Sequence, residues 1–281
     1  MIAVRLEGRL GNQMFQYAFI FAAAQKLNTS FYLDKSLENF IPDEYFIVKN
    51  NGIKQFGSPV FNIKGYKNLF NFYLKRTFYK AIQNFSFGSK LIVISNNTQP
   101  KLALNQLANG YMYWGYFQSD KYFTPQITNA NELFTVKSKY IAQYQKAVKV
   151  SPNRKTAAVH IRRGDYNSLG YTLPTAYYRK AIALVSAQDD VDFIFISDDI
   201  AFVESEFADI THKQVSRNSE IVDLQILMNA DICILANSSF SWWGAYLNSK
   251  ASLIIAPKYW LGTTEAKEFP VEVIPAHWTK I

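Results

Sequence analysis

Two adjacent arginines stand where a short apolar run of the sequence ends. Arg162 and Arg163 follow the run from Thr156 to Ile161, which is typical of a buried strand. A guanidinium group near a core is expensive to hold without an anionic partner, and its fork of N–H groups matches a phosphate. The sequence therefore predicts that at least one arginine binds a phosphate group, with structural pairing to Asp165 or Asp198 as the alternative.

Hydroxyl and amide groups cluster after a second apolar run. The segment from Asn237 to Gly244 (NSSFSWWG) follows an expected strand from Asp231 to Ala236 and opens a helix. Hydroxyls and backbone amides at the start of a helix form a cradle for phosphate. Capping of the helix by one serine is the simpler alternative, but it does not explain three hydroxyls beside two tryptophans.

A third candidate lies near the N-terminus, where Gly8 to Gln13 (GRLGNQ) separates a strand from Ile2 to Leu6 and a helix from Asn12 to Leu27. Glycine lets the backbone approach a ligand, and a helix N-terminus attracts anions. The segment is neither a P-loop nor a Gly-x-Gly-x-x-Gly motif. A plain strand-to-helix turn is an equally good interpretation.

The spacing of the ligand-type residues disfavours a metal site. His160, His212 and His277 lie far apart, with no second ligand at metal spacing. Asp190 to Asp192 (DVD) matches the D-x-D pattern of some sugar-nucleotide enzymes, but it precedes a strand. We expect it to be an exposed turn at the opposite sheet edge. The single cysteine, Cys233, excludes an intrachain disulfide and is expected to be a small buried hydrophobe.

The elements that position these clusters alternate between short apolar strands and helices of about ten residues. Besides the segments above, we expect helices at Pro174–Ala187 (capped by Thr172), Ser219–Asn229 and Phe240–Leu247, and strands at Phe31–Leu33, Leu91–Ser95, Tyr111–Phe117, Phe193–Ile196 and Ser252–Ala256. This order predicts βαβ units and parallel sheets, whose ligands bind at the carboxyl ends of strands. Two α/β domains are expected, 1–150 and 151–281.

The net charge of +8 comes from one segment. The chain has 30 Lys+Arg and 22 Asp+Glu, and residues 45 to 119 contain nine bases and no acid, so the rest sums to −1. A nucleic-acid partner is therefore not expected. Residues 64–90 have the spacing of a basic amphipathic helix, which either contacts an anionic membrane or turns a solvated face to water.

No apolar stretch approaches the roughly 20 residues that span a bilayer, and the N-terminus lacks a signal-peptide pattern. We expect a cytoplasmic protein. If the basic helix contacts a membrane, the protein would also lie peripherally on the inner face of the cell membrane.

Together the motifs resemble those of the bacterial α-1,2-fucosyltransferases, glycosyltransferase family 11. The resemblance rests on Gly8 to Ala18 (GRLGNQMFQYA), Tyr116 to Phe123 (YFQSDKYF), His160 to Tyr166 (HIRRGDY), Ser197 to Asp199 (SDD) and Asn237 to Leu247 (NSSFSWWGAYL). A Gly is more common at Arg9, and a Glu at Asp120. The motifs follow the family's order in both halves, and their combination is highly specific.

The resemblance implies an α/β, GT-B-like fold of two Rossmann-like domains facing a cleft. The N-terminal domain would face the acceptor and carry the basic insert at about 64–90, and the C-terminal domain would bind GDP-fucose. The implied reaction is an inverting transfer of L-fucose from GDP-β-L-fucose to the 2-hydroxyl of a galactoside, without a metal or other cofactor. The implied acceptors are galactose-terminated oligosaccharides or lipid-linked glycans of lipopolysaccharide or capsule.

The hypothesis assigns roles on the donor side. The expected donor-binding residues are Gly11, Asn12, His160, Arg162, Arg163, Asp198, Ser238, Ser239 and Phe240. The arginines and the serine loop would stabilise the charge that grows on the β-phosphate. By family analogy Asn12 reaches the diphosphate or the fucose, and His160 either touches the nucleotide or is a buried, satisfied histidine. Asp198, with Asp223 second, would accept the two donors of guanine.

On the acceptor side, Asp165 is the expected base that takes the acceptor proton, with Glu7 and Asp120 behind it. In the simpler alternative, Asp165 only orients Arg163. A third possibility is a strongly dissociative reaction, which needs little help from a base.

Two other functions remain compatible with the sequence. One is a fucosyltransferase that forms another linkage, since the donor motifs are more distinctive than the acceptor ones. The other is a non-catalytic nucleotide or polyanion binder that uses the basic segment. The location of the motifs outside that segment argues against the binder.

Overall fold

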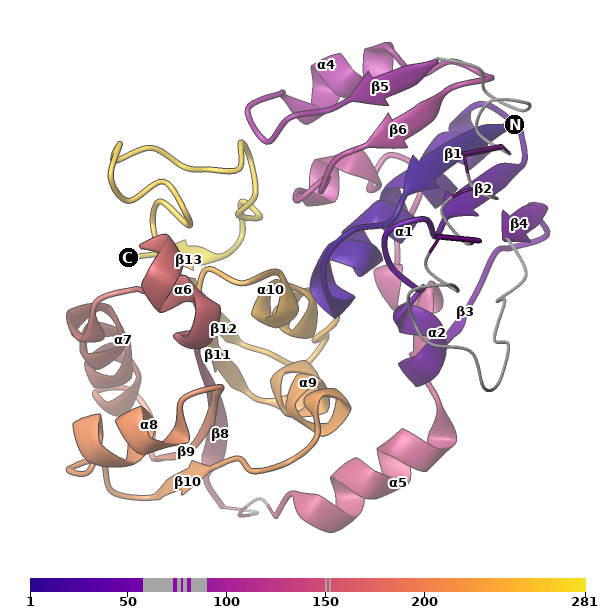
Figure 1. Ribbon diagram of the computed structural model, residues 1–281. Coiled ribbons are helices and arrows are strands. Elements are labelled where there is room, and N and C mark those ends of the chain that lie inside the picture. The colour runs from indigo at the N-terminus through magenta and orange to yellow at the C-terminus, as the bar shows by residue number, and fades with distance from the viewer. Residues whose placement is uncertain (58–72, 75–76, 78–79, 82–89, 150, 152) are drawn as a thin grey trace. The chain divides into compact units, whose positions relative to one another are not determined.

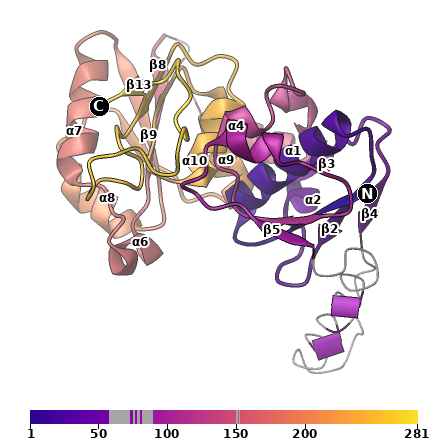
Figure 2. The same cartoon turned by 90° about the horizontal axis from the view of Figure 1, so that it is seen from above.

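The computed structural model describes residues 1–57, 73–74, 77, 80–81, 90–149, 151 and 153–281 (Figure 1). The chain forms two compact units, Met1–Thr135 and Val136–Ile281. Each unit is built on a sheet of parallel strands with helices packed on it, as Figures 1 and 2 show. The predicted α/β class with two Rossmann-like units is therefore confirmed.

The first unit has a five-stranded sheet in the order β4-β2-β1-β6-β5. Its strands are β1 (Ile2–Arg5), β2 (Phe31–Asp34), β4 (Gln55–Gly57), β5 (Leu91–Val93) and β6 (Met112–Trp114). The other described elements are α1 (Leu10–Lys26), α2 (Pro42–Tyr45), β3 (Phe46–Val48), α4 (Pro100–Asn105), the 3-10 turns Asp120–Tyr122 and Ala130–Glu132, and β7 (Phe134–Val136). A small two-stranded sheet pairs β3 with β7.

Helix α1 is the core of the first unit. Of its 17 residues, 14 are buried, so its long apolar run is explained by packing on all sides. In the described ranges the structure has no helix that is both long and apolar enough to cross a membrane.

The second unit has a six-stranded sheet in the order β10-β9-β8-β11-β12-β13. Its strands are β8 (Lys155–Ile161), β9 (Val191–Ser197), β10 (Lys213–Val215), β11 (Ile232–Ile234), β12 (Leu253–Ala256) and β13 (Thr279–Lys280). Its helices are α5 (Ser138–Ala147), α6 (Gly164–Leu169), α7 (Thr175–Ser186), α8 (Ile200–Glu206), α9 (Glu220–Asn229) and α10 (Ser239–Tyr246).

Helices cover both faces of this second sheet (Figure 1). Side chains of α7 and α8 form one apolar cluster with Ala157, Val159 and Ile161 of β8. Helices α9 and α10 pack together on the other face. Because both faces are covered, six of the seven β8 residues are buried, as is usual for a central parallel strand.

Each sheet has a topological switch point, where chain order reverses between neighbouring strands. It lies between β1 and β6 in the first sheet and between β8 and β11 in the second. Ligands of open α/β sheets bind beside such points, at the carboxyl ends of the strands. We call these two places the β1 edge (Glu7, Asn12, Trp114, Tyr116 and Gln118) and the β8 edge (Arg162 to Asp165, Asp198, Asp199 and Asn237 to Phe240).

The structure refines three expectations from the sequence. The division between the units falls after Thr135 and not after residue 150, because α5 packs on α9 and the Gln225 amide donates to the Tyr140 carbonyl at 3.0 Å. The strand expected at Tyr111–Phe117 is shorter, since only Met112–Trp114 pairs in the sheet. Thr172 does not cap α7; its hydroxyl bonds Asn167, and Pro174 precedes the helix. The basic helix predicted at 64–90 falls mainly on residues outside the described part.

Candidate active site

The two arginines of the β8 edge project from the loop after β8, and each meets acids of the second unit. The Arg162 guanidinium lies 2.6 Å from Asp165 Oδ1 and 2.7 Å from Asp198 Oδ2. The Arg163 backbone amide donates to Asp198 Oδ1 at 2.9 Å. Asp198 comes from the loop after β9, so the neighbouring strand holds Arg162 in place. The predicted alternative of pairing with Asp165 or Asp198 is thus present in the structure, and Asp165 contacts Arg162, not Arg163.

Arg163 is fixed separately. Its Nε lies 3.0 Å from Asp199 Oδ2, and its guanidinium carbon lies 3.7 Å from the centre of the Phe202 ring. Asp199 also caps α8, because its Oδ1 accepts from the Phe202 amide at 3.1 Å. Both arginine side chains stay partly accessible, at 18% for Arg162 and 24% for Arg163.

Gly164 explains how Asp198 comes so close to the arginine loop. A Cβ atom at this position would lie 2.6 Å from Asp198 Oδ2. A glycine is needed here for space, because a larger residue would push the Asp198 carboxylate away from Arg162.

The serine loop after β11 begins α10. Ser238 is the N-cap residue, yet its side chain caps no amide among the described residues. Simple N-capping therefore does not account for Ser238. The first turn of α10 lies at the carboxyl edge of the sheet, with Ser238 buried and Ser239 and Phe240 partly exposed. Backbone amides at such a helix start can bind phosphate.

The rest of this motif is structural. Ser241 donates to the carbonyl of Ala236 at 3.1 Å. Trp242 and Trp243 are fully buried, and the Trp242 indole donates to the Val273 carbonyl at 2.7 Å. The two tryptophans that made the motif conspicuous belong to the core and not to the site.

His160 is buried beside this loop. Its ring centre lies 5.4 Å from that of Phe240. Burial, helped by the charge of Arg162, lowers the pKa of His160 to about 3, so the imidazole is neutral at physiological pH. Its Nδ1 atom and the Oδ1 atom of Asn237 are both buried without a hydrogen-bond partner in the described part of the chain. These two atoms flank the switch point and have unused hydrogen-bonding capacity.

The two candidates for guanine recognition differ in their surroundings. Both oxygens of Asp198 already bond the arginine loop, although a carboxylate oxygen can accept more than one bond. Asp223, in the first turn of α9, accepts from the Ser216 hydroxyl at 2.5 Å. Burial raises the pKa of Asp223 to about 6, despite the opposing effect of that hydrogen bond.

At the β1 edge, Asn12 lies in the first turn of α1 with its side-chain oxygen bonded to the Gln118 amide at 2.8 Å. Gly8 has a φ of +81°, and a Cβ atom there would lie 2.5 Å from Asn12 Nδ2. Arg9 has an extended backbone with a φ of −87°, so an arginine fits without strain. Gly11 is buried in the first turn of α1.

Sequence reasoning missed the two glutamines that fix this edge. Gln16 accepts from the Glu7 amide at 3.1 Å and donates to the Gly115 carbonyl at 3.1 Å, so one side chain joins the loops after β1 and β6. Gln13 donates to the Gly8 carbonyl at 3.0 Å. The signal was available, because two amides at positions i and i+3 of an apolar helix must find partners when buried.

The third feature of the β1 edge is a carboxylate among aromatic residues. The Trp114 indole donates to Glu7 Oε2 at 2.7 Å. The Tyr116 hydroxyl also bonds Glu7, and burial together with the Glu7 charge raises the pKa of Tyr116. The aromatic strand drew attention in the sequence, but its link to Glu7 did not.

The opposite edge of the second sheet holds the D-x-D pattern. Arg154 lies 2.7 Å from Asp190 and 2.8 Å from Asp192, so one guanidinium forms ion pairs with both acids. Nearby, a cavity of about 640 Å³ is lined by polar residues that include Arg154 and Lys155. No group of three metal-ligand residues occurs in the part of the chain that the structure describes.

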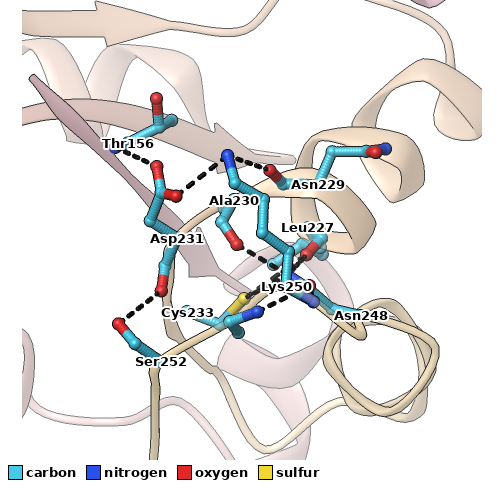
Figure 3. Close-up of polar contacts among 10 residues, drawn as sticks. Thr156, Leu227, Asn229, Ala230, Asp231, Cys233, Asn248, Lys250 and Ser252 are labelled. Carbon is cyan, nitrogen blue, oxygen red and sulfur yellow. Dashed lines mark hydrogen bonds and ion pairs between the residues drawn. The ribbon is translucent and has the colours of Figure 1, made fainter. Parts of the chain in front are cut away.

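Figure 3 shows that the same edge is tied together by internal contacts. Asp231 accepts from the Thr156 amide at 2.9 Å and pairs with Lys250 at 2.9 Å. The Asn248 amide bonds two carbonyls near Cys233. Cys233 is fully buried as predicted, and burial raises the pKa of its thiol to about 12. The contacts at this edge therefore have a structural role.

The structure thus brings most of the predicted donor residues together. His160, the two arginines, Asp165, Asp198 and the serine loop all lie at the β8 edge. Gly11 and Asn12 lie at the β1 edge, on the other unit. The guanidinium groups of Arg162 and Arg163, together with the N-terminus of α10, can neutralise the charge of a diphosphate.

The chain is similar to known proteins in sequence and in fold. The chain is 28% identical to an α-1,2-colitosyltransferase of Escherichia coli, over 100% of this chain and 99% of that protein. It is 29% identical to the O-antigen biosynthesis glycosyltransferase WbnK of Escherichia coli, over 93% and 96% respectively.

Two solved structures show the same GT-B-like fold. The fucosyltransferase NodZ from Bradyrhizobium has a TM-score of 0.53 at 12% identity, covering 90% of this chain and 94% of that one. A variant of Arabidopsis thaliana FUT1 in complex with GDP has a TM-score of 0.53 at 11% identity, covering 98% and 75%.

The sequence profile described as Glycosyl transferase family 11 matches residues 1–280. The chain therefore belongs to glycosyl transferase family 11 and is a fucosyltransferase-like glycosyltransferase.

Proposed function

We propose that this protein transfers L-fucose from GDP-β-L-fucose to the 2-hydroxyl of a galactoside, with inversion at the sugar carbon. The observation that carries this proposal is the pair of arginines fixed at the end of β8, together with the N-terminus of α10 that follows the adjacent strand β11. The α-1,2 linkage in the name of one relative supports the choice of hydroxyl. NodZ crystals with GDP and with GDP-fucose support the choice of donor.

The β8 edge would bind the diphosphate. As the bond between fucose and phosphate breaks, its electron pair stays on the β-phosphate oxygen, and Arg162 and Arg163 stabilise that charge. Their ion pairs use only part of the five N–H donors on each guanidinium. Ser238, Ser239 and the amide of Phe240 supply further donors without adding charge.

A metal cofactor is not part of this proposal. Arg154 occupies both acids of the D-x-D pattern, and these acids lie at the edge of the sheet away from the arginine loop. Neutral His160 would offer its Nδ1 atom to the donor, because a buried group without a partner favours a ligand that supplies one.

We place guanine against Asp198 or Asp223 and the fucose against Asn12. An amide suits the hydroxyls of an uncharged sugar, and Asn12 is fixed by Gln118. Asp165 remains a candidate for the base. Its contact with Arg162 also gives it a role in orienting that guanidinium.

The acceptors we propose are galactose-terminated glycans of the cell surface, since one relative acts in O-antigen biosynthesis. Contact of the basic segment with an anionic membrane remains part of the proposal and would bring the enzyme to lipid-linked acceptors.

A second candidate differs only in the donor sugar. Colitose is L-fucose without the 3-hydroxyl, and a relative that aligns with the whole chain is named a colitosyltransferase. A site that bonds the 3-hydroxyl would reject the deoxy sugar strongly, whereas an apolar site would not.

The decisive assay measures GDP release from GDP-fucose and from GDP-colitose, with and without lactose, followed by NMR of the product linkage. We expect lactose-dependent GDP release, an α-1,2 product and equal rates in EDTA. Release with GDP-colitose alone would favour the second candidate. Absence of transfer with either donor and any galactoside would contradict both, and loss of activity in EDTA would contradict the metal-independent mechanism.

A further inference from the structure

The Glu7 carboxylate is held differently from the other acids at the two switch points. It lies two residues after the end of β1 and receives the Trp114 indole N–H at 2.7 Å and a bond from the Tyr116 hydroxyl. Both partners come from the end of β6 and the loop behind it. Neither partner carries a charge when it donates.

The frame around this carboxylate is rigid. The Glu7 backbone amide bonds Gln16, which is fully buried. The Arg5 guanidinium lies 5.2 Å from the centre of the Trp114 ring and pairs with buried Asp34 at 3.2 Å. Glu7 is therefore positioned by the core of the first unit.

The contrast with the β8 edge concerns the partners of the carboxylates. Asp165, Asp198 and Asp199 each form an ion pair with an arginine side chain. In the described residues Glu7 forms no ion pair and is held by the neutral Trp114 indole. Its carboxylate is therefore not engaged by a guanidinium and can bond a hydroxyl group of a ligand.

The surroundings of Glu7 also fit an uncharged sugar. The amides of Asn12 and Gln118 lie at the same switch point, and amides and carboxylates bond hydroxyl groups well. Glu7, Trp114 and Tyr116 are all partly exposed, so a ligand can reach the cluster.

We propose that Glu7 binds the attacking hydroxyl of the acceptor galactoside and takes its proton, and that Trp114 and Tyr116 position it for this. The inference rests on the proposed function. In the step, the hydroxyl oxygen forms a bond to the fucose anomeric carbon while the bond from that carbon to the β-phosphate oxygen breaks. The hydroxyl proton moves to Glu7, and the electron pair of the broken bond leaves with GDP.

The test compares Glu7→Gln, which keeps the size and loses the basicity, with Glu7→Asp and Trp114→Phe. Exposed Glu132 of the same unit provides the control variant Glu132→Gln. Each protein is assayed for transfer to lactose, for hydrolysis of GDP-fucose without acceptor and for GDP binding by calorimetry. Circular dichroism and thermal melting check the fold.

We expect Glu7→Gln to lower transfer by roughly 10²–10⁴-fold, the usual contribution of a general base. GDP affinity should stay within about twofold of wild type, because GDP binding does not involve the acceptor hydroxyl. Glu7→Asp and Trp114→Phe should each lower transfer by a smaller factor of roughly tenfold. The shorter aspartate displaces the carboxylate, and loss of the indole N–H releases it. Glu132→Gln should behave as wild type.

Transfer by folded Glu7→Gln near the wild-type rate would overturn the inference and leave the proposed function intact. A large loss in Asp165→Asn together with normal transfer in Glu7→Gln would return the base role to Asp165. Equal loss of transfer, hydrolysis and GDP binding in Glu7→Gln would also overturn it, because Glu7 would then serve the donor or the fold. Lack of transfer by the wild type itself would instead contradict the proposed function.

Discussion

The two switch points have the same topology and opposite chemistry. At the β8 edge the side chains are charged, with two guanidinium groups set among three carboxylates. At the β1 edge the contacts are made by amides, an indole and a phenol around one carboxylate. A parallel sheet provides the place for a ligand, whereas the loop residues decide whether that ligand is an anion or a neutral sugar.

Apart from Glu7→Gln, the largest effect that would test this contrast is expected from Arg162→Ala. Removing a donor aimed at the developing phosphate charge should lower kcat/KM by roughly 10²–10³-fold. Steady-state kinetics with varied GDP-fucose and calorimetry with GDP provide the measurement. Arg217→Ala is the matched control, because Arg217 is 65% exposed and pairs only with Glu204 in the described structure. Unchanged kinetics in folded Arg162→Ala would remove the charged edge from the donor site.

A second effect concerns pH and is confined to the second unit. The folded pKa of Asp223 is about 6 against an ordinary value of 3.8, because burial disfavours the charged form. The contribution of Asp223 to stability is thus fully present below pH 4 and lost as pH rises through 6. Asp223→Asn removes this dependence, so the variant should gain about 2–3 kcal/mol relative to wild type between pH 4 and pH 7.

Urea unfolding of both proteins at several pH values measures that gain. Parallel curves for the wild type and the variant would show that Asp223 ionises normally in the folded state. If Asp223 also reads guanine, Asp223→Asn should reduce the preference for GDP over inosine diphosphate, which lacks the second guanine donor.

The smallest effects are expected from a pair of glycines, one at each edge. Gly164→Ala should displace Asp198 and weaken binding of both GDP and GDP-fucose by roughly threefold to tenfold. Gly8→Ala should displace Asn12 and cost about 1–2 kcal/mol of stability, because its φ of +81° strains any residue with a Cβ. Gly8→Ala should weaken GDP-fucose binding and leave GDP binding unchanged. Calorimetry with both ligands makes the comparison, and the reverse pattern would contradict the division of labour between the edges.

The sequence predicts the parallel sheets well because their strands are short apolar runs followed by polar loops. Thr156 to Ile161 and Phe31 to Leu33 are recognisable from composition alone. Helix α5 was missed as part of the second unit, because its contact with α9 depends on Gln225, which is distant in sequence. The residue type of Thr172 predicts a helix cap, whereas α7 begins after Pro174.

The candidate site also depends on contacts between residues that are distant in sequence. The sequence brings Arg162, Arg163 and Asp165 to one strand end, but Asp198 and Asp199, which also pair with these arginines, come from the loop after β9. The sequence predicts Asp198 either as a partner of the arginines or as the reader of guanine, and the structure shows both of its oxygens on the arginine loop. Glu7 was a secondary candidate, since nothing in its own segment reveals the indole that approaches from Trp114. Side-chain partners across strands depend on register, which local patterns do not encode.

Gln16 has a consequence for redesigning acceptor preference. Its amide satisfies one backbone group in each of the two loops at the β1 edge, so the loop frame does not depend on the loop side chains. An exposed residue of the loop after β1, such as Arg9, can therefore be exchanged while the main chain keeps its course. Libraries that vary such positions and leave Gln16, Glu7 and Trp114 untouched should retain folded, donor-competent members in which new acceptor sugars can be selected.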